Sequence, residues 1–154
     1  MNIYKFAILC LFLLLSCAFD PSIQTWYEYE ESKIPSFDKI EDACYWLYDN
    51  ISYKSGGESD FFRTADEILE LKEGDCEDIA ILLMAIIYKQ YRKKATCIFV
   101  KEGNNVGHVV VKLNSYYYDT RGKIEIDNSK IKLSVPFDNM TLLISTTLAY
   151  KYMK

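Results

Sequence analysis

The first half of the chain alternates polar stretches with apolar positions at helical spacing. Apolar side chains recur every three or four residues over 37–51, after Ser36, a residue type typical of helix N-caps, and they predict a first helix. Residues 64–67, Thr-Ala-Asp-Glu, form a capping box that predicts a short helix over 65–71. Residues 76–92 are apolar over most of their length, which predicts a helix buried at the centre of the domain.

Beyond residue 94 the period changes from that of a helix to that of strands. Strands are predicted over residues 96–101, 106–113, 116–119, 124–126 and 131–135, with another near 141–144 and a last short helix after Thr146. Asn114-Ser115 fits a two-residue hairpin loop between two of these strands. Helices followed by an antiparallel meander predict an α+β fold.

The N-terminus has the pattern of an export signal. Residues 6–19, FAILCLFLLLSCAF, carry no charge and are too short for a comfortable membrane span of about 20 residues. We therefore predict a signal peptide over 1–16, a lead-in over 17–35 and one domain over 36–154. The stretch Leu-Leu-Ser-Cys that ends at Cys17 resembles a bacterial lipobox, which would make Cys17 a lipidated membrane anchor. A plain cleavage site and an uncleaved anchor are the alternatives, and all three export the domain.

Composition narrows the function classes. A length of 154 residues suits one domain, and a 50% apolar content excludes a disordered chain. The net charge of −4, from 18 basic and 22 acidic residues, argues against a nucleic-acid partner. His108 is the one histidine, so a site that needs two histidines is excluded within one copy of the chain. The sequence carries no signal for an oligomeric state.

A cysteine and the histidine are placed for nucleophilic chemistry. Cys76 would be the first residue of the buried helix, where free backbone N–H groups and the helix dipole favour a thiolate. The same amides can stabilise an oxyanion, and Gly74 leaves room for a substrate. His108, in a predicted strand, is the candidate base. The carboxylates beside Cys76 oppose a low thiol pKa, so His108 or another cation must offset them.

Strand register supplies a third member of this site. If Asn114-Ser115 is a two-residue loop, Val111 pairs with Tyr118, and His108 and Asp119 become diagonal neighbours on one face of the sheet. Such neighbours lie about 7–8 Å apart at Cα, within reach of their side chains. A three-residue loop would send Asp119 to the other face. Cys76 would then be the nucleophile, His108 the base and later the acid, and Asp119 the group that orients the imidazole.

These residues also carry a family resemblance, over roughly residues 36–122. Gly74-Asp75-Cys76-Glu77-Asp78-Ile79-Ala80 resembles the G-D-C-E-D-x-A signature of bacterial transglutaminase-like cysteine peptidases. Gly107-His108-Val109-Val110-Val111 resembles their histidine strand, and Tyr117-Tyr118-Asp119 the strand that ends in their aspartate. The resemblance implies a papain-like core, in which a catalytic helix packs on an antiparallel sheet, and thiol acyl transfer, more often by peptidases or amidases than by protein cross-linkers.

We therefore predict an exported cysteine hydrolase, a peptidase or amidase. It would act on a protein or peptide through Cys76, His108 and Asp119 and a thioester acyl-enzyme, with no required cofactor. If an amine replaced water, the same triad would make the protein an acyltransferase. The rival class is a non-enzymatic binding lipoprotein on the same scaffold.

Two further expectations concern the acidic residues and the other thiols. Some periplasmic relatives bind calcium through acids beside the cysteine, and Asp75, Glu77 and Asp78 match those positions. Helix capping is the competing interpretation of Asp75 and Glu77. Cys44 lies on the apolar stripe of the first helix and Cys97 in a strand, so we expect buried thiols, with a Cys44–Cys97 disulfide as an alternative.

Overall fold

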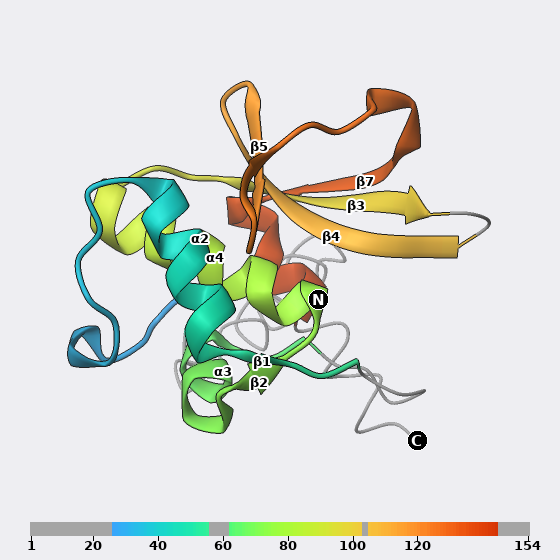
Figure 1. The fold of residues 1–154 in the computed structure, drawn as a ribbon. Helices are drawn as coiled ribbons and strands as arrows, with labels where there is room; N and C mark the ends of the chain where they lie inside the picture. Colours follow the sequence, from blue (N-terminus) through green and yellow to red (C-terminus); the bar gives the residue numbers. More distant parts are fainter. Residues whose placement is uncertain (1–25, 56–61, 103–104, 145–154) are drawn as a thin grey trace, which may run out of the picture.

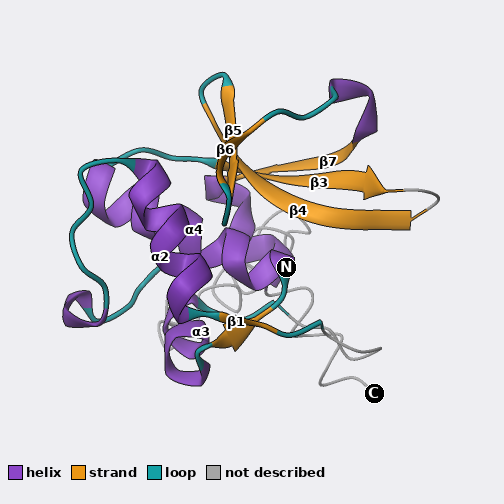
Figure 2. Cartoon of the chain, viewed as in Figure 1, coloured by secondary structure: helices purple, strands orange, loops and turns teal. Residues whose placement is uncertain are grey.

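A layer of helices covers one face of a five-stranded antiparallel sheet (Figure 1; Figure 2). The computed structural model describes residues 26–55, 62–102 and 105–144. Its α-helices are α2 (Ile40–Asn50), α3 (Ala65–Leu71) and α4 (Cys76–Tyr91), with short 3-10 turns at Glu31–Lys33, Asn128–Lys130 and Phe137–Asn139. The sheet has the order β6-β5-β4-β3-β7, made of β6 (Gly122–Ile124), β5 (Tyr116–Asp119), β4 (Asn105–Leu113), β3 (Thr96–Glu102) and β7 (Ile131–Pro136). The predicted α+β class is confirmed.

α4 is the central element of the core. Every side chain from Asp78 to Ile87 is buried, because the helices lie on one side of α4 and strands β3 and β4 on the other (Figure 1). The described part of the predicted lead-in also belongs to this core, since Trp26, Tyr29 and Ile34 are at most 6% exposed. The Trp26 carbonyl accepts a hydrogen bond from the Ala65 N–H at 2.8 Å, which attaches the lead-in to the start of α3.

The predicted helices over 65–71 and 76–92 are confirmed, but the predicted N-cap at Ser36 is wrong. α2 begins at Ile40, with Lys39 at its N-cap position. The chain just before α2 is held by α4 instead: the Phe37 N–H donates to Gln90 at 3.1 Å, and its carbonyl accepts from the Tyr91 hydroxyl at 3.0 Å. These tertiary bonds keep the segment extended past the residue type that would have capped a helix.

The predicted strand near 141–144 is also wrong. Residues 140–144 are helical, and Met140 and Ile144 are buried in the core. Two buried positions four residues apart fit the helical period. The continuous apolar run at 142–144 resembles a strand, and this led to the wrong prediction. The predicted strand at 124–126 is observed two residues earlier, as β6, and the predicted helix after Thr146 lies outside the described residues.

The thiols away from the helix start lie in the interior. Cys44 and Cys97 are both fully buried, which confirms the expected core positions. Both carry free thiols, so the Cys44–Cys97 disulfide alternative is wrong.

A two-stranded parallel ladder links α2 to the start of α4. β1 (Ser52–Tyr53) pairs with β2 (Glu73–Gly74), and Tyr53 lies opposite Gly74. The Ser52 N–H donates to the Lys72 carbonyl and the Lys54 N–H to the Gly74 carbonyl, both at 2.9 Å. The chain that leaves α2 is therefore fixed beside the chain that enters α4.

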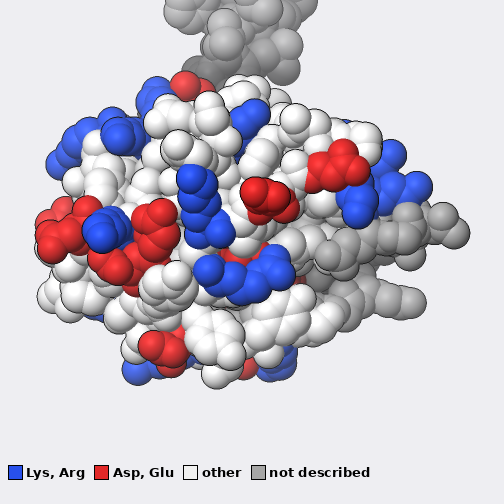
Figure 3. All heavy atoms as spheres, turned by 45° about the horizontal axis from the view of Figure 1, so that its top comes forward, with Lys and Arg blue, Asp and Glu red and all other residues white. Residues whose placement is uncertain are grey.

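The molecular surface carries both signs of charge. On the face in Figure 3, Lys and Arg side chains alternate with Asp and Glu, and neither sign forms a continuous field. None of the described helices combines the length and apolar character that crossing a bilayer requires.

Candidate active site

The start of α4 is capped by the residue before Cys76. Asp75 is the N-cap, and its Oδ1 accepts hydrogen bonds from the N–H groups of Glu77 at 3.0 Å and Asp78 at 3.2 Å. This confirms the capping interpretation of Asp75 and places Cys76 first in the helix. It also changes the expected oxyanion site, because two of the first-turn amides are already occupied by a carboxylate.

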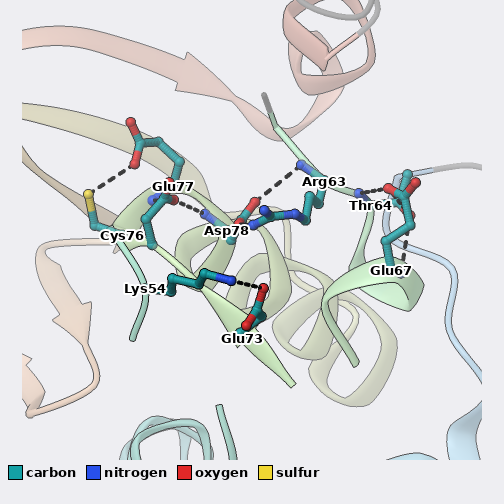
Figure 4. Close-up of polar contacts among 9 residues, drawn as sticks. Lys54, Arg63, Thr64, Glu67, Glu73, Cys76, Glu77 and Asp78 are labelled. Atoms are coloured by element: carbon teal, nitrogen blue, oxygen red, sulfur yellow. Dashed lines mark hydrogen bonds and ion pairs between the residues drawn. The ribbon is translucent and has the colours of Figure 1, made fainter. Parts of the chain in front are cut away.

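The space beside Gly74 is filled by Asp78 and not by a substrate. A Cβ on Gly74 would lie 2.7 Å from the Asp78 Cβ, so this position excludes any larger residue. The Asp78 carboxylate, 1% exposed, accepts from the Arg63 N–H at 3.2 Å and forms an ion pair with the Arg63 guanidinium (Figure 4). Burial and the charge of Asp75 raise the pKa of Asp78, and the contacts with Arg63 oppose that rise.

The Cys76 thiol is protonated in this arrangement. Its Sγ donates to Glu77 Oε2 at 3.1 Å (Figure 4) and accepts from the Val109 N–H. Burial, followed by the hydrogen bond and the charge of Glu77, raises the pKa of Cys76 to about 12. Burial also raises the pKa of Glu77. The predicted preference for a thiolate at the helix start is therefore overcome here by desolvation and by one carboxylate.

The sheet brings His108 and Asp119 together. The predicted register is confirmed, since Val111 pairs with Tyr118 and Lys112 with Tyr117 across the Asn114-Ser115 loop. His108 Nε2 and Asp119 Oδ2 are 3.0 Å apart. The Arg121 N–H also donates to Asp119 at 2.8 Å, and the Arg121 guanidinium binds the same carboxylate. Burial opposes ionisation of Asp119, but the hydrogen bonds from His108 and Arg121 outweigh it and hold its pKa well below the ordinary value.

A β-bulge lies directly before His108. β3 pairs Val100 with His108 and then Lys101 with Val106, so Gly107 is the extra residue on β4. A bulge bends its strand and re-aims the neighbouring side chain, and bulges are frequent beside active sites. Gly107 therefore has a local structural role, which is to let the strand bend where the histidine projects.

Cys76, His108 and Asp119 line one small cavity of about 50 Å³. The thiol reaches this cavity from the first turn of α4, and the other two side chains reach it from β4 and β5. The sulfur nevertheless donates to Glu77 and not to His108 in the part of the chain that the structure describes. The three candidate residues thus share a site, with the thiol turned to a different partner.

The acidic residues at the helix start are engaged with the protein itself. Asp75 binds helix amides, Glu77 accepts from Cys76, and Asp78 binds Arg63. Within residues 26–55, 62–102 and 105–144, no group of three or more His, Cys, Asp and Glu side chains is arranged to hold a metal ion. The calcium site stays a prediction. Cys17 lies outside the described residues.

Sequence reasoning missed both arginines of the site. Arg63 is separated from Asp78 by 15 residues that include a loop and α3, so no local pattern could pair them. Arg121 could have been predicted from the sequence. An aspartate at a strand end commonly accepts a hydrogen bond from the N–H two residues later. That turn places the side chain of Arg121 beside Asp119.

A comparison with protein families agrees with this geometry. A family model described as a transglutaminase-like domain matches residues 23–121, a span that includes Cys76, His108 and Asp119. No curated protein and no solved structure matches the chain significantly.

Proposed function

Because the chain belongs to the transglutaminase-like domain family, we propose that it is a cysteine hydrolase, a peptidase or amidase acting on a protein or peptide. The observation that carries this proposal is the 3.0 Å contact between His108 and Asp119 at the cavity that Cys76 also lines. A nucleophile, a base and a group that orients the base are the parts that acyl transfer through a thiol requires.

The first step is transfer of the thiol proton. The Cys76 side chain turns about its Cα–Cβ bond from Glu77 toward His108, and the imidazole nitrogen that does not face Asp119 accepts the proton. Asp119 is ionised, since its pKa lies far below neutrality, and its charge stabilises the imidazolium that forms. The Val109 N–H, which already donates to the sulfur, also stabilises the thiolate.

The acyl group is then transferred to the sulfur. The thiolate attacks the carbonyl carbon and a C–S bond forms, while the carbonyl π electrons move to oxygen. The Cys76 N–H is not one of the two amides bound by Asp75, and we assign it as a backbone donor to that oxyanion. Collapse of the intermediate breaks the C–N bond, and the imidazolium gives its proton to the leaving amine.

Hydrolysis completes the cycle. His108 takes a proton from water, and the resulting hydroxide attacks the thioester carbonyl. The C–S bond then breaks to release the acid, and the imidazolium returns its proton to the sulfur to restore the Cys76 thiol. An amine that entered in place of water would give a new amide by the same steps. The acyltransferase is therefore a variant of this proposal and shares its residues.

We further propose that this chemistry takes place outside the cytoplasm. The support comes from the sequence: an uncharged apolar run at residues 6–19 and a lipobox-like end at Cys17. A lipidated Cys17 would hold the domain at a membrane surface.

One observation favours the rival function, a non-enzymatic binding lipoprotein. A thiol whose pKa is raised to about 12 and which is hydrogen bonded to Glu77 is a poor nucleophile in its resting position. The two functions differ in whether His108 can ever take the proton of Cys76, and that difference can be measured.

The test is alkylation by iodoacetamide at neutral pH, with the full-length protein in mild detergent and the modified cysteine mapped by mass spectrometry. Because only a thiol paired with His108 loses its proton near neutrality, wild-type Cys76 should react at least about tenfold faster than Cys76 in His108→Ala. The labelling rate of Cys76 in Asp119→Asn should fall between the rates in wild type and in His108→Ala. Buried Cys44 and Cys97 act as internal controls for folding. Equal rates in wild type and His108→Ala would exclude the enzyme and leave the binding protein.

A further inference from the structure

An exposed aromatic ring stands at the edge of the candidate active site. Tyr53 is 65% exposed and yet lines the cavity together with Cys76 and His108. Its backbone is fixed, because it pairs with Gly74 two residues before the nucleophile and the following N–H donates to the Gly74 carbonyl at 2.9 Å. These backbone hydrogen bonds hold the main chain of Tyr53 beside the segment that leads to Cys76.

The floor of the same cavity is apolar. Ile79, Ala80 and Leu83 follow Cys76 by three, four and seven residues, so they lie beneath it on one face of α4. Val111 and Tyr118 close the cavity from the sheet. Apart from His108 and Asp119, which bind each other, no ionisable carboxylate, ammonium or guanidinium group lines it within the described residues.

We propose that Tyr53 and this cavity form the subsite for an apolar side chain of the substrate, next to the carbonyl that Cys76 attacks. The inference rests on the proposed function and adds to it a class of substrate and a specificity-determining residue. An aliphatic group gains free energy when it leaves water for the apolar floor and for the face of the tyrosine ring. A carboxylate would lose its hydration there, because no ammonium or guanidinium group lines the cavity within the described residues and His108 already binds Asp119.

The test compares two irreversible reagents on the full-length protein. N-acetyl-leucine and N-acetyl-aspartate chloromethyl ketones carry the same reactive group and differ in the side chain beside the carbonyl. Iodoacetamide, which has no side chain, measures the reactivity of the thiol alone. The readout is the second-order rate constant for modification of Cys76, mapped by mass spectrometry, and each ketone rate is divided by the iodoacetamide rate of the same protein.

Three variants separate the ring from general effects. In wild type the leucine ketone should react about tenfold faster than the aspartate ketone. Tyr53→Ala should lower the normalised rate of the leucine ketone about tenfold. Tyr53→Phe should keep the wild-type rate, because the ring and not the hydroxyl covers the apolar group. Tyr48→Ala removes a ring that is 70% exposed on α2 and does not line the cavity, so it should match wild type.

The outcomes distinguish the two proposals. Normal iodoacetamide labelling with equal leucine and aspartate rates, or with an unchanged leucine rate in Tyr53→Ala, overturns the apolar subsite alone. Iodoacetamide labelling that does not depend on His108 overturns the enzyme and the subsite with it. A tenfold preference for leucine that is lost in Tyr53→Ala and kept in Tyr53→Phe establishes the apolar subsite, and labelling that also depends on His108 supports the enzyme.

Discussion

At the scale of single residues, the protonation state of Cys76 results from opposing influences at one helix terminus. The helix dipole and the Val109 N–H favour a thiolate, whereas burial and Glu77 favour the thiol. Asp75 shifts the balance further, because its carboxylate takes the Glu77 and Asp78 amides that would otherwise face an anion. The outcome, a pKa raised to about 12, describes a thiol that stays protonated while it is hydrogen bonded to Glu77.

We predict that Glu77→Gln makes Cys76 more reactive. The substitution removes a negative charge that lies against the sulfur, and repulsion between like charges at that distance raises the thiol pKa by at least about one unit. The fraction of thiolate at neutral pH, and with it the rate of iodoacetamide labelling, should therefore rise about tenfold or more. The measurement is the labelling rate of Cys76 as a function of pH.

Glu70→Gln supplies the control for that variant, because it removes the same charge from an exposed position on α3. Its pH profile should coincide with that of wild type. A Glu77→Gln profile that also coincides with wild type would mean that burial alone sets the pKa of Cys76.

The sequence was sufficient to select Cys76, His108 and Asp119 as candidates, because a helix start, a single histidine and a hairpin register are local patterns. It could not show that the thiol donates to Glu77, since that depends on a side-chain rotamer and on burial by strands far along the chain. The same limit applies to Gly74: the residue type was noticed, but the atom that fills its space, the Asp78 Cβ, is visible only in three dimensions.

At the scale of elements, an ion pair joins the segment before α3 to the first turn of α4. Asp78 is almost fully buried, whereas the Arg63 side chain is 34% exposed, so the pair is partly shielded from water. Arg63 also donates its backbone N–H to Asp78, and the next residue, Thr64, caps α3. One short stretch of chain thereby fixes the starts of two helices, and the second of them carries the candidate nucleophile.

We predict that Arg63→Met destabilises the domain at neutral pH by about 2 kcal/mol. Breaking a fully buried pair costs about 3–5 kcal/mol, and the partial exposure of Arg63 reduces that figure. Urea unfolding followed by tryptophan fluorescence measures the loss. Arg63→Met/Asp78→Asn should recover part of it, because no buried charge is then left without a partner. Arg92→Met, at the exposed far end of α4, is the control and should change stability little.

The same variant has a pH signature with a defined sign. The folded pKa of Asp78 is raised above its unfolded value of about 3.9, so the folded state binds the proton more tightly. Its contribution to stability is complete below that value and is lost as pH rises through the folded pKa. Without Arg63 the folded pKa rises further, so the deficit of Arg63→Met should shrink between pH 7 and pH 4. A deficit that stays constant or grows on acidification would contradict the ion-pair account.

Local patterns predicted the elements where periodicity and capping agree, as in α3 with its Thr64–Glu67 capping box and in the hairpin of β4 and β5. Local patterns gave wrong predictions where tertiary contacts determine the secondary structure. Ser36 is followed by Phe37, whose backbone bonds to α4 keep it out of a helix, and residues 140–144 are helical because Met140 and Ile144 both face the core.

At the scale of the whole molecule, the proposed cellular location depends on residues outside the described fold. The domain supplies no membrane-spanning helix among its described residues and shows a mixed charge on the face in Figure 3. The proposed attachment to a membrane therefore depends on the lipobox-like sequence at Cys17. Lipid chains provide that attachment in proportion to their length, at about 0.8 kcal/mol for each buried CH₂ group, and two chains give a stable anchor.

We predict that Cys17→Ser abolishes lipidation and leaves the folded domain intact. In a bacterial host fed labelled palmitate, the wild-type protein should carry the label and sediment with membranes, and Cys17→Ser should carry none. Cys10→Ser is the matched control, because it changes a cysteine inside the apolar run and should keep the label. An unlabelled wild type would contradict the lipoprotein: recovery in the soluble fraction would then favour a plain cleavage site, and recovery in membranes at full mass an uncleaved anchor. Because Cys76 is remote from residue 17 in the sequence, all three proteins should show the same iodoacetamide rate at Cys76, which separates where the protein works from what its thiol can do.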